Sequence, residues 1–203
     1  IMLAVFSACK AEKTVPAAEK KSPEIKPAQR LLIPGGQAYT GAYIDFGETE
    51  DDVTPEALEN FEALAGRHQA VIGFSNYWGK QSFPHKQLRI IAGYGAVALI
   101  YWNPWDHPYV EENKPDRFNL NEIIAGRWDQ YIDMWAREAA ATGTTLLVSW
   151  GLEMNGTWFP WSGFFYGGGT VIPGTDPPQY QGPENFKKAY RHIVDRARAA
   201  GAG

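Results

Sequence analysis

The sequence predicts an α/β fold with a parallel sheet, arranged as a (β/α)8 TIM barrel of which about the first four strand–helix units are present. Short apolar runs alternate four times with helical patterns, which is typical of parallel strands joined by right-handed crossovers. A doubly wound sheet shares this alternation. The turn Phe46-Gly47-Glu48, however, lacks the spaced glycines of a dinucleotide site, so the barrel is favoured.

Four segments are predicted to be strands, and they cover residues 42–46, 70–75, 97–102 and 145–148. The last is a continuous apolar or β-branched run, of the kind that is buried on both faces of a sheet. Polar or aromatic residues follow several of these strands. This pattern matches the rule that barrel sites gather at the carboxyl ends of strands.

Start and stop signals frame three helices. The first is expected over residues 54–66, with a threonine cap, a proline in its first turn and a glycine at its end. A long helix is expected from about 120 to 142, capped by Asn119 and carrying one apolar stripe. The last helix is expected from about 186, and it ends at Gly201.

The beginning of the chain differs from the rest in composition. Residues 1–9 are expected to be a truncated lipoprotein-type signal peptide, because a short apolar run precedes Cys9, the single cysteine. Phe6-Ser7-Ala8-Cys9 resembles the bacterial lipoprotein processing site, which would make Cys9 the lipidated residue; the alternative is an ordinary thiol. Residues 10–30, rich in Lys, Glu, Ala and Pro, are a linker. We therefore expect an exported cell-envelope lipoprotein or secreted protein, with residues 31–203 as the folded half-barrel.

The charge and the polar residues exclude several classes of function. A net charge of −4 gives no basic surplus for nucleic acid, and contact with a membrane is expected only through the N-terminal anchor. The four histidines show no metal-ligand spacing, and no nucleophilic triad is legible, so no metal or cofactor is predicted. Eight tryptophans and ten tyrosines fit either carbohydrate binding or an aromatic-rich core.

The most informative segment follows the fourth predicted strand. It places Glu153, Asn155, Trp158 and Trp161 within nine residues. A carboxylic acid can protonate a glycosidic oxygen, an amide can bind a hydroxyl, and an indole can stack on the apolar face of a pyranose. The alternative is a surface acid beside ordinary core tryptophans. The clustering favours a sugar site.

The segment Gly151 to Trp161, Gly-Leu-Glu-Met-Asn-Gly-Thr-Trp-Phe-Pro-Trp, resembles the acid/base segment of family 26 glycoside hydrolases, the β-mannanases and related endoglycanases. The resemblance implies a (β/α)8 barrel with Glu153 as general acid/base at the end of strand four and Trp158 as a sugar-stacking residue. The family usually has His before this Glu, where this sequence has Leu152. The match therefore supports the fold and the acid more firmly than it supports mannan.

A complete barrel needs about 250 residues, and about 170 follow the linker, so we interpret the chain as the N-terminal half of a catalytic domain. In the family's retaining mechanism the nucleophile is a second Glu at the end of strand seven. The resemblance therefore places the nucleophile in the missing C-terminal part. This part of the protein is expected to be inactive by itself.

Four further residues are weaker candidates for substrate binding. Trp78, Trp102 and Trp105 follow or end predicted strands and are expected either to form sugar platforms or to pack in the core. His107 follows the third strand and either contacts sugar or lies in a solvent turn.

Together these observations predict a retaining endo-glycoside hydrolase that cleaves a β-linked polysaccharide or oligosaccharide. β-Mannan is the first substrate to consider; a β-1,3/1,4-glucanase or β-xylanase of the same family is the alternative. The competing class is a carbohydrate-binding barrel without catalysis, for which Leu152 is the argument.

Overall fold

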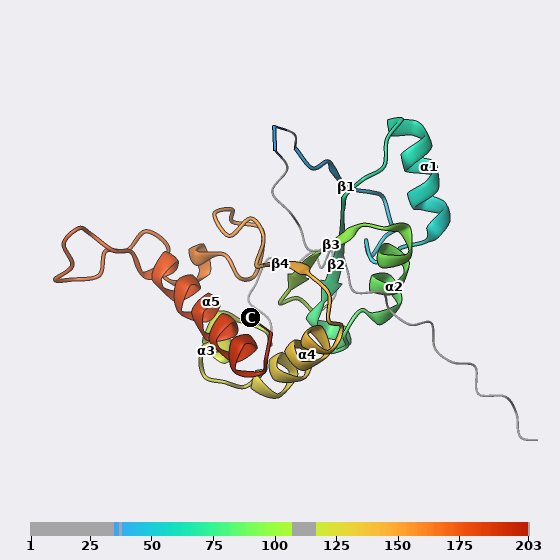
Figure 1. The fold of residues 1–203 in the computed structure, drawn as a ribbon. Coiled ribbons are helices and arrows are strands. Elements are labelled where there is room, and N and C mark those ends of the chain that lie inside the picture. Colours follow the sequence, from blue (N-terminus) through green and yellow to red (C-terminus); the bar gives the residue numbers. More distant parts are fainter. Residues whose placement is uncertain (1–34, 37, 107–116, 203) are drawn as a thin grey trace, which may run out of the picture.

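A computed structural model of the chain describes residues 35–36, 38–106 and 117–202 (Figure 1). Four parallel strands alternate with helices, and the sheet has the order β1-β2-β3-β4. The strands are β1 (Gly41–Tyr43), β2 (Val71–Tyr77), β3 (Val97–Asn103) and β4 (Leu146–Trp150). The predicted α/β alternation is confirmed, with each strand within a few residues of its expected position.

In the described residues, five α-helices and two 3-10 turns connect or follow the strands. They are α1 (Pro55–Ala65), η1 (Trp78–Lys80), α2 (His85–Tyr94), α3 (Leu120–Ile124), α4 (Asp129–Ala141), η2 (Gly163–Tyr166) and α5 (Gln181–Ala199). Figure 1 shows α1 and α2 on one side of the molecule, α3 and α5 on the other, and α4 between them. None of the helices in the described part of the chain is long and apolar enough to cross a membrane.

The predicted caps form as expected. Thr54 Oγ1 accepts a hydrogen bond from the Ala57 amide at 3.2 Å, and Gly66 ends α1 with a φ of 66°. The prediction of one helix over residues 120–142 is wrong. Gly126 adopts a φ of 80°, a left-handed conformation that a helix cannot continue through, and it separates α3 from α4.

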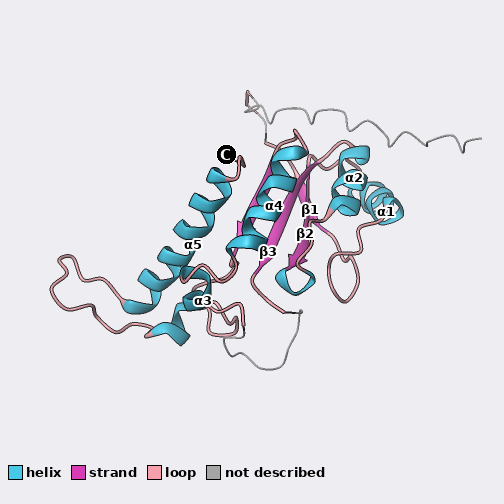
Figure 2. Cartoon of the chain, turned by 90° about the horizontal axis from the view of Figure 1, so that it is seen from below, coloured by secondary structure: helices cyan, strands magenta, loops and turns pink. Residues whose placement is uncertain are grey.

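Alternate residues of each strand serve opposite faces of the sheet. Ile72, Phe74 and Ile100 are fully buried in the core, and Trp102 of β3 stacks on Trp135 of α4 with ring centroids 4.3 Å apart. Figure 2 shows α4 running alongside the strands. The other face carries Ser75, Tyr77, Tyr101 and Asn103, which line a cavity together. This second face therefore positions the candidate site.

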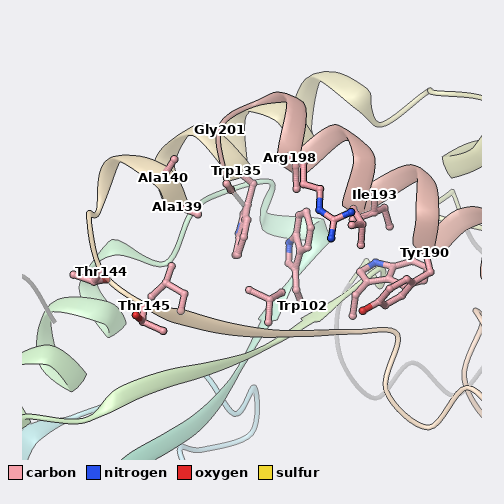
Figure 3. A pocket seen from close by; sticks show the side chains of 16 residues that line it. Trp102, Trp135, Ala139, Ala140, Thr144, Thr145, Tyr190, Ile193, Arg198 and Gly201 are labelled. Carbon is pink, nitrogen blue, oxygen red and sulfur yellow. The ribbon is translucent and has the colours of Figure 1, made fainter. Parts of the chain in front are cut away.

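The prediction that the fourth strand is buried on both faces is wrong for the described structure. β4 lies at the edge of the sheet, and Val148 is 43% exposed. The side chains of β4 that lie on the α4 side border an open groove between α4 and α5 (Figure 3). An edge strand lacks the neighbour that covers an interior strand.

Candidate active site

The chain makes a tight turn immediately after β4, and this turn presents Glu153. Gly151 has a φ of 64°, and a side chain at this position would meet the ring of Phe186 at 2.9 Å. Glu153 itself has a φ of 51°, which is uncommon for a residue other than glycine. Such strained residues cluster at functional sites, where the surrounding structure holds them in place.

The Glu153 carboxylate is oriented by Trp158. The indole Nε1 donates a hydrogen bond of 2.7 Å to Glu153 Oε2. The Trp158 ring lies directly against Gly156, where an added Cβ would come within 2.4 Å of it, yet half of the side chain stays exposed. Trp158 thus combines a hydrogen bond to the acid with an exposed aromatic surface.

Glu153 lines a cavity of about 330 Å³ at the carboxyl ends of the strands. Aromatic, hydroxyl, amide and acidic side chains from all four strand ends surround it. They are Tyr43, Glu50, Ser75, Tyr77, Tyr101, Asn103, Trp105, Leu152, Glu153 and Phe159. The size and the mixture of rings with a few polar groups are typical of small-molecule sites. Burial raises the pKa of Tyr77 to about 12, so its phenol is protonated at neutral pH.

A cluster of rings supports one side of the cavity. Phe159 stacks on Trp161 with centroids 4.5 Å apart, and Trp105 meets both edge-on at 5.4 and 5.8 Å. Trp161 is buried, and its Nε1 donates a hydrogen bond of 2.7 Å to the Leu152 carbonyl. Trp161 therefore fastens the turn that carries Glu153, whereas Trp105 lines the cavity itself.

The other predicted site residues lie in different environments. Trp78 is fully buried, and Trp102 is 2% exposed and donates to the Tyr131 hydroxyl at 3.0 Å, so both belong to the core. Neither residue lines the cavity that contains Glu153, so of the two expected environments the core is the one observed, with Trp102 also bordering the groove between α4 and α5. Asn155 is exposed and, like Trp158, is absent from the cavity lining, but it has no hydrogen bond to Glu153 of the kind that Trp158 makes. His107 and Cys9 lie outside the described residues.

Most of the cavity residues that come from the first three strands and the loop after β1 were not predicted from the sequence. Tyr43, Glu50, Ser75 and Asn103 come from β1, the loop after it, β2 and β3. Their position at or after the ends of predicted strands was the sequence feature that could have identified them. The register of the strands, which brings their side chains together, depends on tertiary structure. No group of histidine, cysteine and acidic side chains in the described ranges could hold a metal ion.

The groove between α4 and α5, which we call the groove beside β4, has a volume of about 570 Å³ and lies on the other side of the sheet. Its lining is mostly apolar, with Trp102, Trp135, Tyr190 and Ile193 among the labelled side chains in Figure 3. It holds no carboxylate among its lining residues. The smaller cavity is therefore the candidate active site, because it contains the acid.

Fold and site together define an α/β protein with a carboxylate in an aromatic cavity at the carboxyl ends of parallel strands. Over 147 residues the chain is 28% identical to Endoglucanase H of Acetivibrio thermocellus, a glycoside hydrolase. The match covers 72% of this chain and 14% of that protein's length, so the chain corresponds to a small part of its relative. No protein-family model matches the sequence.

Proposed function

We propose that this protein is a glycoside hydrolase acting on a β-linked polysaccharide, with Glu153 as the general acid/base. The observation that carries the proposal is Glu153 in an aromatic cavity at the end of β4, with its carboxylate bonded to an exposed indole. A positioned carboxylic acid protonates the leaving oxygen, and a flat ring holds the sugar beside it. The distant similarity to an endoglucanase supports the same class of reaction.

The proposed mechanism is retaining and endo-acting, with a second carboxylate as nucleophile. Retention requires two carboxyl groups about 5 Å apart on opposite sides of the scissile bond. We assign the second to a part of the domain beyond these residues. The proposal includes completion of the sheet into a (β/α)8 barrel, which is supported by the parallel order and by the exposed Val148 on the outer β4 strand.

Two substrates deserve the first assays. Resemblance of the Glu153 segment to family 26 enzymes favours β-mannan, and similarity to an endoglucanase favours β-glucan; β-xylan is the third candidate. Leu152 lines the cavity, where an apolar side chain cannot bind a sugar hydroxyl. This substitution for the family's usual histidine is the specific reason to test β-glucan beside mannan.

The test is release of reducing sugar by the protein expressed from the complete reading frame, on mannan, β-glucan and β-xylan. Glu153→Ala should reduce release at least a hundredfold, as expected for removal of a general acid/base. Glu48→Ala removes an exposed acid from the loop after β1 and should retain activity. Binding of oligosaccharides without any hydrolysis would instead favour the non-catalytic carbohydrate-binding barrel.

We further propose that the protein is exported and anchored through Cys9. The support is the apolar run before this cysteine and the charged, proline-containing linker after it. Expression in a bacterium with a radiolabelled fatty acid should label the protein, and Cys9→Ser should abolish the label. An unlabelled, unprocessed protein would leave Cys9 an ordinary thiol.

A further inference from the structure

One wall of the candidate active site faces Glu153 across the cavity and has no role in the proposed acid catalysis. It consists of Tyr43, Glu50, Ser75 and Tyr101, which we call the β1–β3 wall. Tyr43 and Tyr101 meet edge-to-face, with ring centroids 5.2 Å apart. A carboxylate thus lies among hydroxyl groups and aromatic rings, the combination that binds polar ligands with apolar faces.

The loop that carries Glu50 is held by several bonds. The Glu50 amide donates to the Gly47 carbonyl at 2.9 Å, and the Ser75 amide donates to the Glu50 carbonyl at 2.9 Å. The next residue, Asp51, is buried and forms an ion pair with Lys80. Glu50 has a φ of 53°, a conformation that costs free energy without glycine. Its position therefore depends on the surrounding structure, unlike that of a solvated surface acid.

Two hydroxyl groups orient the Glu50 carboxylate. Tyr43 donates a hydrogen bond to Glu50 Oε2, and Ser75 Oγ lies 3.4 Å from the same oxygen. The Tyr43 and Ser75 oxygens are themselves 3.0 Å apart. Burial and the bond to Glu50 raise the pKa of the Tyr43 hydroxyl above its ordinary value, so it stays a donor. A carboxylate accepts several hydrogen bonds at once, so ligand hydroxyls can join these donors.

Asn103 provides an independent sign of a ligand. It ends β3, lines the same cavity and is 3% exposed. Its Oδ1 atom has no hydrogen-bond partner among the described residues. An unpaired buried acceptor is unfavourable, and a hydroxyl group donated by a ligand would relieve it.

Glu50 belongs to the side of the cavity away from Glu153. Its carboxylate is held on β2 through Ser75, whereas Glu153 follows β4, two strands away. At about 4.8 Å per strand the two backbones are about 10 Å apart, and both residues line the same cavity. Glu50 is therefore placed to contact a sugar ring in this cavity from the side opposite the acid.

We propose that Glu50 and Asn103 bind hydroxyl groups of a pyranose ring in the substrate, and that Glu50 determines which sugar configuration the cavity accepts. This inference rests on the proposed function of the same cavity. Adjacent hydroxyls of a pyranose are hydrogen-bond donors, and a fixed carboxylate accepts them only when their relative orientation matches. The ligand is thus a β-linked oligosaccharide with one ring on the β1–β3 wall.

The test measures oligosaccharide affinity in a Glu153→Gln background, which prevents turnover. Titration calorimetry with β-glucan and β-mannan oligosaccharides of three to six sugars compares Glu50→Gln with Glu48→Gln. Glu50→Gln should weaken the better ligand about tenfold to a hundredfold, as for a hydrogen bond to a charged group. Glu48→Gln, a charge change on the same loop, should stay within about twofold.

A deoxy ligand separates recognition from a structural effect. An oligosaccharide that lacks the hydroxyl bound by Glu50 should bind weakly to the parent, and Glu50→Gln should weaken it no further. Tyr43→Phe, which removes the orienting donor but keeps the acid, should weaken the complete ligand about threefold. This variant keeps the inference testable if Glu50→Gln does not fold.

The outcomes distinguish the two proposals. If no β-linked oligosaccharide binds the Glu153→Gln protein, the proposed function and this inference both fail. If oligosaccharides bind and Glu50→Gln and Tyr43→Phe both match Glu48→Gln, only this inference is overturned. It is also overturned if Glu50→Gln, with Glu153 intact, lowers kcat while oligosaccharide affinity is unchanged, since that gives Glu50 a catalytic role.

Discussion

Replacing Trp158 by phenylalanine tests whether this residue positions the acid as well as holding the sugar. The substitution keeps a flat ring on Gly156 and removes the N–H that donates to Glu153 at 2.7 Å. A hydrogen bond to a charged group contributes about 1.5–3 kcal/mol, and the exposure of both side chains favours the lower value. About 1.4 kcal/mol corresponds to a tenfold change in rate.

We therefore expect Trp158→Phe to lower kcat about tenfold with KM within about twofold, because the ring face for stacking remains. Trp158→Ala removes both functions and should also raise KM about tenfold, the effect of losing an aromatic contact. Steady-state kinetics on the best polysaccharide measures both constants. Trp128→Phe is the matched control, because this indole donates at 3.0 Å to the Arg117 carbonyl and not to Glu153.

A Trp158→Phe protein with unchanged kcat, beside a Trp158→Ala protein with weakened binding, would refute the positioning role and leave only stacking. Loss of the folded state in both variants, with normal binding by the remaining folded protein, would place Trp158 in the core instead. Circular dichroism and thermal melting of each variant therefore accompany the kinetics.

Three further predictions follow from the site and the fold. Glu153→Ala should slow the cleavage of glycosides with poor leaving groups far more than the cleavage of aryl glycosides with good leaving groups, since the latter need little protonation. Equal and small losses of kcat on both substrates would show that Glu153 is not the general acid. Gly151→Ala should lower the free energy of unfolding, measured by urea titration, by about 1–3 kcal/mol, because φ at this position is 64° and the new methyl group meets Phe186. Gly169→Ala is the control, because it has open space around it and should change the free energy of unfolding little. Equal effects of the two substitutions would contradict the steric argument. Residues 31–203 alone should not hydrolyse mannan, β-glucan or β-xylan, because a retaining mechanism needs a second carboxylate. The same protein should bind an apolar fluorescent dye in the groove beside β4. Turnover that Glu153→Ala abolishes would place the nucleophile within these residues.

Local sequence patterns were sufficient for the parallel sheet and for the place of the acid. Apolar runs, caps and glycine stops depend on neighbouring residues, so residues 54–66 and the strand before Glu153 were predicted close to their observed bounds. The broken helix at Gly126 was missed, since an isolated glycine is often tolerated within a helix.

Tertiary structure decided which aromatic residues can reach a ligand. Trp102 and its neighbour Tyr101 are both rings in one strand, but alternation sends the first against α4 and the second into the cavity. Likewise Trp161 fastens the turn while Trp158 stays exposed, although both follow Glu153 closely. Glu50 could not be chosen over Glu48 or Asp52 from sequence, because only the packing of its loop on β2 brings its carboxylate to Ser75.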